Sequence, residues 1–148
     1  MVAIGFTVFK EKILSGEKTQ TIRPYSEKRW LSILRNKKLQ LYWKLRTKNT
    51  EFLKEVVAVE LFKIMFLEDW DDLGHKVIIV KRTDNAFSAP REDFLFNRSE
   101  RWRDMSVDEI KEMARRDGFD DEFQMFKWFE NKYGKDIWGK ELMVIRWR

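Results

Sequence analysis

The sequence predicts an α+β domain, and three observations support this prediction. Short runs rich in β-branched and aromatic residues occur near both ends and in the middle of the chain, as expected of strands. Segments with helical periodicity and clear start or stop signals lie between these runs. The 148 residues suit one domain, and no linker, low-complexity stretch or internal repeat divides them. We therefore expect a single domain over 1–148, with helices inserted between and flanking strands whose order is compatible with a small barrel.

The first half of the chain is expected to alternate short strands and helices, with boundaries set by Gly and Pro. The expected order is a strand at 4–9, a helix at 10–15, a strand over 16–23, a helix at 26–36 and a strand at 39–45. Gly16 ends the first helix, and Pro24 ends the second strand while it holds Arg23 extended. Ser26 is the expected N-cap of the second helix.

The second half is expected to contain two strands, then two helices and a closing strand. These elements are strands at 55–67 and 76–81, helices at 107–116 and 120–133, and a strand at 141–148. Ser106 and Glu109 form a capping box, and Gly118 ends that helix. The next helix carries an aromatic stripe made of Phe123, Phe126, Phe129 and Tyr133. Residues 81–104 lack periodicity and are expected to form a long excursion that interleaves arginines with aromatic residues.

The composition excludes several classes of protein and site. With no cysteine there are no disulfides, zinc-thiolate sites or cysteine nucleophiles, which fits a reducing cytoplasm. No apolar run approaches the ~20 residues that span a bilayer, and no signal peptide is recognisable. No set of His and carboxylates has the spacing of a metal site, so we expect no metal or other cofactor and interpret His75 as a turn residue. A charged fraction of 37% against five Asn and three Gln favours a thermophilic source.

Positive charge is concentrated in the first third of the chain. Residues 1–50 hold twelve Lys/Arg and three Asp/Glu, a net of +9, whereas the remainder has a net of −4 and the whole chain +5. This asymmetry predicts one face for a polyanion, most plausibly RNA. The alternative is a solvated surface whose charges balance in three dimensions.

The segment GEKTQTIRPY at 16–25 combines groups that could hold an anion or start an acyl transfer. A threonine hydroxyl becomes a nucleophile when a base removes its proton, and a lysine with a lowered pKa can be that base. Lys18, Thr21 and a carboxylate are therefore enough for amide hydrolysis. Positions three apart on a straight strand point to opposite faces, so these two side chains meet only if the chain turns around Lys18. The alternative is an ordinary strand with a polar face, in which Arg23 pairs with a carboxylate.

Asp117 is the candidate carboxylate, because it falls seven residues beyond Ile110 on the inward stripe of the helix at 107–116. Burial and the negative end of the helix dipole would both raise its pKa. The alternative is that Asp117 lies at a frayed helix end and turns to water. The carboxylate would then be Glu60 or Glu68.

Gly16, Lys18 and Arg23 resemble the signature of ASCH domains, in which Gly-x-Lys is followed closely by a polar segment ending in Arg. Residues 114–119, ARRDGF, resemble a later stretch of the family, and the order of elements is similar over most of the chain. The resemblance implies a PUA-like barrel. GEKTQTIR also matches, at every specified position, the Gly-x-Lys-Thr-x-Thr-Ile-Arg motif of a subgroup that removes the acetyl group from N(4)-acetylcytidine.

By this resemblance Thr21 is the nucleophile, Lys18 its activating base and Asp117 the third partner. The subgroup carries glutamate at the position of Asp117. The aspartate arm is one methylene shorter, by roughly 1.5 Å.

Three functions stay open at this point. The basic first third favours binding of RNA or a modified nucleotide in a cleft around GEKTQTIR, and the complete motif favours an amidohydrolase acting on N(4)-acetylcytidine. The third is a structural or protein-binding module, which the polar richness of the segment disfavours.

The expected ligand-binding residues are those of the segment and aromatic residues that could stack on a base: Gly16, Lys18, Thr19, Arg23, Tyr25, Trp30 and Trp43.

Overall fold

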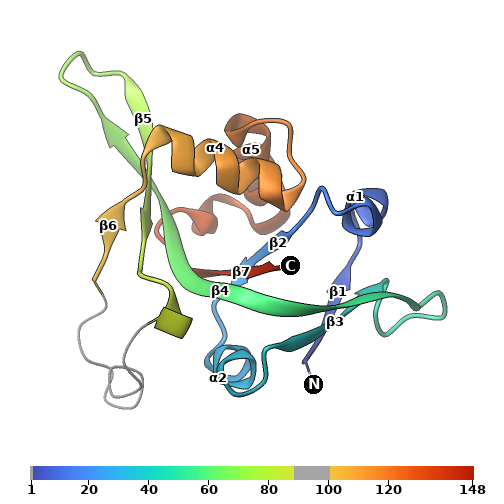
Figure 1. Ribbon diagram of the computed structural model, residues 1–148. Helices are drawn as coiled ribbons and strands as arrows, with labels where there is room; N and C mark the ends of the chain where they lie inside the picture. Colours follow the sequence, from blue (N-terminus) through green and yellow to red (C-terminus); the bar gives the residue numbers. More distant parts are fainter. Residues whose placement is uncertain (1, 89–100) are drawn as a thin grey trace.

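The computed structural model describes residues 2–88 and 101–148, which form an α+β fold as predicted (Figure 1). The strands are β1 Val2–Phe6, β2 Gln20–Pro24, β3 Lys38–Trp43, β4 Glu51–Trp70, β5 Lys76–Arg82, β6 Arg103–Asp104 and β7 Leu142–Trp147. The α-helices are α1 Lys10–Ser15, α2 Glu27–Arg35, α4 Val107–Asp117 and α5 Glu122–Tyr133, and two 3₁₀ turns cover Ala86–Ser88 and Lys135–Ile137. No helix among the described residues is long and apolar enough to cross a membrane.

The long strand β4 connects the two parts of the sheet and runs across the molecule (Figure 1). Its first part pairs with β3, and its later part pairs with β7 on one side and β5 on the other, all antiparallel. The strand expected at 55–67 is therefore too short. Its ends at Phe52 and Trp70 are exposed and give no core signal in the sequence, but pairing with β3 and β5 keeps them extended.

The strands do not close into a barrel, so the barrel expectation is wrong. In the described chain β1 pairs with β3 in parallel, β2 pairs with β7, and β1 and β2 do not pair with each other. A side chain partly bridges this open edge, because Arg23 on β2 donates from Nη2 to the main-chain oxygen of Gly5 on β1. The candidate site described below lies at this opening.

Two clusters of buried side chains form the core. The first lies between the sheet and the helices α4 and α5, and includes Ile22, Phe62, Met113, Phe129 and Val144. The second lies against β1, β3, α1 and α2, and includes Ile4, Ile13, Ile33, Leu39 and Trp147. Successive side chains along β4 point to opposite faces, so the strand contributes to both clusters. Leu61 belongs to the second and Phe62 to the first.

The helix α4 begins and ends where the sequence predicts. Ser106 and Glu109 form the complete capping box, and Gly118 ends the helix at φ 107°. The aromatic stripe predicted on α5 is wrong at one position, since Phe123 is exposed and Met125 is buried instead. Asp121 is the N-cap of α5, and the helix that starts there turns Met125 towards the core.

The predicted excursion at 81–104 is partly regular structure. Its first two residues belong to β5 and pair with Arg103 and Asp104 of β6, while residues 89–100 lie outside the described residues. Arg82, one of the arginines of this segment, is buried with its guanidinium 3.8 Å from the centroid of the Phe62 ring. It also lies 3.8 Å from a carboxylate oxygen of Glu109.

Candidate functional site

A pocket of about 290 Å³ lies at the opening between β1 and β2, with α5 and the segment 44–47 as further walls. Lys18, Thr21, Arg23 and Asp117 all line it. The structure therefore brings together the three residues predicted for catalysis. The other lining residues are mostly apolar or aromatic, with two further lysines: Gly5, Phe6, Thr7, Val8, Phe9, Ile22, Lys44, Leu45, Thr47, Phe119, Trp128, Phe129, Lys132 and Tyr133.

The turn that the motif requires is present. Gly16 is in the left-handed conformation at φ 85°, where α1 ends, and β2 begins only at Gln20. The residues between them are not in a strand, so the alternation of a strand does not separate Lys18 from Thr21. The main-chain N–H of Lys18 donates to the oxygen of Lys12 at 2.9 Å, and that of Thr19 to Arg116 at 2.9 Å. These two hydrogen bonds hold the turn after Gly16 against α1 and against the end of α4.

Lys18 and Asp117 form a buried pair, with 3% and 5% of each residue exposed. Lys18 Nζ donates to the main-chain oxygen of Asp117 at 2.5 Å and lies 3.5 Å from its carboxylate Oδ2. Burial lowers the pKa of Lys18 and raises the pKa of Asp117, and in each case the charge of the partner opposes the shift. Removal from water thus favours a neutral amine on Lys18, which is the form that can accept a proton. The alternative in which Asp117 turns to water is wrong.

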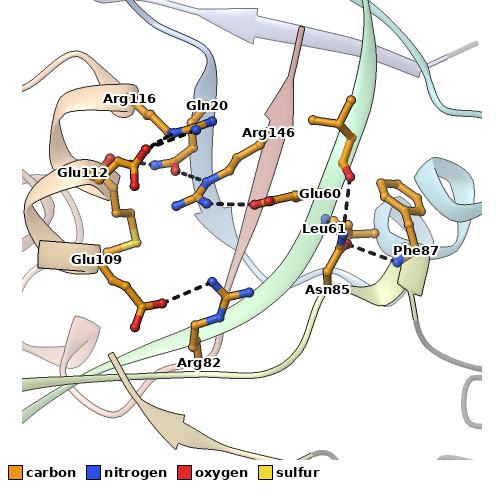
Figure 2. A network of polar contacts seen from close by, with 12 residues as sticks. Gln20, Glu60, Leu61, Arg82, Asn85, Phe87, Glu109, Glu112, Arg116 and Arg146 are labelled. Carbon is orange, nitrogen blue, oxygen red and sulfur yellow. Dashed lines mark hydrogen bonds and ion pairs between the residues drawn. The ribbon is translucent and has the colours of Figure 1, made fainter. Parts of the chain in front are cut away.

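Gln20 contacts the other carboxylate oxygen of Asp117, which Lys18 does not approach. Its Nε2 donates to Asp117 Oδ1 at 3.2 Å and to the oxygen of Met113 at 2.9 Å. Its Oε1 accepts from Arg146 Nε at 2.8 Å, and Arg146 Nη1 pairs with Glu60 at 2.8 Å (Figure 2). A continuous chain of contacts from β4 through β7 and β2 therefore orients the acid at the end of α4.

The two acids considered as alternatives to Asp117 lie elsewhere. Glu60 pairs with Arg146, and Glu68 pairs with Lys76 at 2.8 Å. Neither lines the pocket. Sequence reasoning missed Gln20 as a site residue. Its amide is fully buried and therefore needs polar partners, but this burial is seen only in the structure.

Thr21 and Arg23 lie on the same face of β2, two residues apart. Arg23 Nε donates to Thr21 Oγ1 at 3.2 Å, which leaves the hydroxyl proton of the threonine free for another acceptor. Burial, followed by the charge of Arg29, lowers the pKa of Arg23 to about 10. Arg23 therefore remains a cation at neutral pH, and it lies where negative charge would develop next to Thr21.

Five of the predicted ligand-binding residues do not line this pocket. Gly16 and Thr19 line a second cavity on the other side of the turn, where the oxygen of Thr19 accepts from the main chain of Trp147 at 3.0 Å. Tyr25, Trp30 and Trp43 pack on or within the second core cluster. The ring of Tyr25 meets that of Trp30 edge-on at 5.8 Å, so aromatic packing explains both without a ligand.

The aromatic walls of the pocket come instead from segments far from the motif in the sequence. Phe6 and Phe9 flank the end of β1, and Phe119, Trp128 and Tyr133 follow or belong to the late helices. Among these, Tyr133 is on the stripe that the sequence predicts for α5, but nothing in its sequence context indicates a pocket. Within the described chain, no group of three or more His, Asp or Glu side chains could hold a metal ion.

No family model, curated protein or solved structure matches this chain. The resemblance to ASCH domains therefore stays a prediction that rests on the motif.

Proposed function

We propose that the protein is an amidohydrolase that cleaves the acyl group from the exocyclic amine of an acylated cytosine. N(4)-acetylcytidine is the substrate that the motif resemblance implies. The observation that carries the proposal is the convergence of Thr21, Lys18 and Asp117 on one pocket, with the last two buried as a pair. A lysine with a lowered pKa next to a pocket that holds a threonine hydroxyl supplies a base and a nucleophile without any histidine.

The reaction would proceed in two acyl-transfer steps. Neutral Lys18 takes the proton of Thr21 Oγ1 as that oxygen attacks the acetyl carbonyl. The C–N bond then breaks, the ammonium of Lys18 returns the proton to the leaving amine, and an acetyl ester remains on Thr21. Water, deprotonated by Lys18, attacks the ester and releases acetate and the threonine hydroxyl. Asp117 holds the amine of Lys18 in place and stabilises its charged form in each step.

The walls of the pocket suit a small planar ligand. A volume of about 290 Å³ is close to the lower end of the range for small-molecule sites. Phe6, Trp128 and Tyr133 offer apolar faces that can stack on a base. The guanidinium of Arg23 can stabilise the oxyanion that forms when Thr21 attacks.

Acetate release from N(4)-acetylcytidine tests the proposal, with Thr21→Ala as the variant and Thr19→Ala as the matched control. Both substitutions remove a threonine from the same segment, but Thr19 lines the second cavity. We expect Thr21→Ala to lose at least about 10³-fold in kcat, the scale for removal of a nucleophile, and Thr19→Ala to keep most activity. Equal losses in both variants would contradict the role of Thr21.

A second candidate function is binding of RNA or a modified nucleotide without chemistry. One observation favours it: in the described residues Lys18 Nζ bonds to Asp117, and no hydrogen bond joins Lys18 to Thr21. Binding of RNA oligomers that falls with salt and survives Thr21→Ala would support this alternative. No observation favours a purely structural module.

Membership of the ASCH family and a cytoplasmic location belong to the same proposal. The match of GEKTQTIR to the family motif supports the first, and the absence of cysteine from the sequence supports the second.

A further inference from the structure

Positive charge exceeds negative charge around the pocket. Four cationic residues line it, Lys18, Arg23, Lys44 and Lys132, and Asp117 is the single acid among the lining residues that the structure describes. Asp117 already pairs with Lys18. The other three cations therefore face the pocket without a compensating carboxylate in its walls.

In the described part of the chain, Lys44, Lys132 and Arg23 contact aromatic rings, a hydroxyl or a main-chain oxygen, and not carboxylates. Lys132 Nζ lies 4.8 Å from the centroid of the Trp128 ring, and Lys44 Nζ lies 5.9 Å from that of Trp43. Arg23 donates to Thr21 and to a main-chain oxygen. No ion pair with Asp or Glu is found for any of them in the described chain, whereas lysines such as Lys76 and Lys81 pair with acids at less than 3 Å. A cation that rests on an aromatic face keeps donors free for an anion.

Two more arginines extend the cationic cluster behind the pocket wall. The Nη1 atom of Arg29 is buried and has no hydrogen-bond partner. Burial and then the charge of Arg46 lower the pKa of Arg29, and the charge of Arg29 in turn contributes to the lowered pKa of Arg23. Arg29 and Arg46 do not line the pocket, so they raise the positive potential near Arg23 and do not themselves contact a ligand in it.

The backbone around these cations is strained. Lys44 and Arg46 have φ of 50° and 66°, and Phe9 in the opposite wall has φ of 65°. They are the residues other than glycine with positive φ in the described part of the chain. The oxygen of Lys44 accepts from the hydroxyls of Thr47 and Thr50 at 2.7 and 3.0 Å, so the segment is fixed in this conformation. Strain of this kind is typical of positions that present a group to a ligand.

We infer that Lys44 and Lys132 form a phosphate subsite beside Arg23, so that the ligand is a phosphorylated pyrimidine nucleotide, either free or within a strand. The identity of the base rests on the proposed function, whereas the phosphate subsite rests on the cations alone. Aromatic walls hold the base and the two lysines hold the phosphate. A nucleoside would leave the cationic cluster uncompensated.

Calorimetric titration of the wild-type protein at low salt tests the subsite with compounds that cannot react. Cytidine, cytidine 5′-monophosphate and the trinucleotide CpCpC serve as ligands. We expect the monophosphate or the trinucleotide to bind at least roughly tenfold more tightly than cytidine, a ratio equivalent to ~1.4 kcal/mol. The preference should decline with added salt. Inorganic phosphate should compete with whichever ligand binds. A trinucleotide that binds more tightly than the monophosphate identifies a strand as the source of the phosphate, and the reverse identifies a free nucleotide. Equal affinity for cytidine and both phosphorylated ligands would overturn the proposal.

Lys132→Met and Lys44→Met should each reduce the preference for the phosphorylated ligands over cytidine severalfold. Lys127→Met is the matched control, because Lys127 is exposed on the same helix and does not line the pocket. A similar loss in the control would show a general charge effect and refute the subsite. The outcome is separable from hydrolysis: failure to release acetate removes the proposed reaction, but a preference for phosphate that depends on Lys132 would stand.

Discussion

Replacing Gln20 by Glu is the sharpest perturbation of the pair formed by Lys18 and Asp117. The substitution preserves size and keeps an oxygen for Arg146, which lies 2.8 Å from Gln20 Oε1. It removes the N–H donor that reaches Asp117 Oδ1 at 3.2 Å and places an oxygen there instead. The carboxylate of Asp117 thereby loses a bond that stabilises its charged form.

The expected magnitude follows from that single bond. A hydrogen bond to a charged group contributes ~1.5–3 kcal/mol, and one pKa unit corresponds to ~1.4 kcal/mol. The pKa of Asp117, already raised by burial, should therefore rise further. Since protonation of Asp117 weakens its hold on Lys18, the acid limb of kcat/KM for N(4)-acetylcytidine should move to higher pH by the same amount.

The stability of Gln20→Glu should also depend on pH, in the direction set by the raised pKa of Asp117. A group whose pKa is higher in the folded than in the unfolded state contributes less stability as the pH rises from its unfolded value through its folded value. The loss in Gln20→Glu should therefore be smaller near pH 4, where an unfolded Asp begins to titrate, and larger at neutral pH. Gln124→Glu, at an exposed position of α5, is the control. An acid limb that does not move, or a loss of stability independent of pH, would refute the reasoning.

Two further predictions concern residues that support the site. Gly118→Ala should destabilise the protein by about 1–3 kcal/mol, because φ is 107° and the new Cβ would lie 3.0 Å from the Phe9 ring. Gly16→Ala is the control in urea denaturation, because Gly16 ends a helix in the same left-handed conformation, at φ 85°, with open space around the new Cβ. Equal losses in the two variants would show that the ring does not matter. Glu109→Gln should cost no more than ~1 kcal/mol at neutral pH, since the site is partly exposed. Hydrogen bonds to Arg103 first and then to the capping box lower the pKa of Glu109 to about 2. The contribution of Glu109 to stability should therefore disappear as the pH falls from ~4.5 through 2. A difference in Tm between wild type and variant that persists at pH 2 would contradict this.

Local signals in the sequence predicted much of the fold. The capping box at Ser106, the N-cap at Ser26 and the left-handed Gly16 and Gly118 depend on neighbours a few residues away, and all were found where expected. The inward direction of Asp117 also follows from helical spacing. The open edge between β1 and β2 did not follow, because strand pairing over long separations is not encoded in any one segment.

The aromatic residues of the site show that proximity to the motif in the sequence does not indicate proximity to the pocket. Tyr25 and Trp30 lie close to the motif along the chain, but the chain turns at Pro24 and carries both into the second core cluster. Tyr133 lies more than a hundred residues from the motif and still lines the pocket, because α5 packs across the opening. The contact of Gln20 with Asp117 could not be predicted either, since it depends on how α4 docks on β2.

The most direct test of the central claim is acetate release from N(4)-acetylcytidine by the purified, folded protein. We expect multiple turnovers that disappear in Thr21→Ala and in Lys18→Met. Wild-type protein that binds the compound but releases no acetate would contradict hydrolysis and leave the pocket as a binding site.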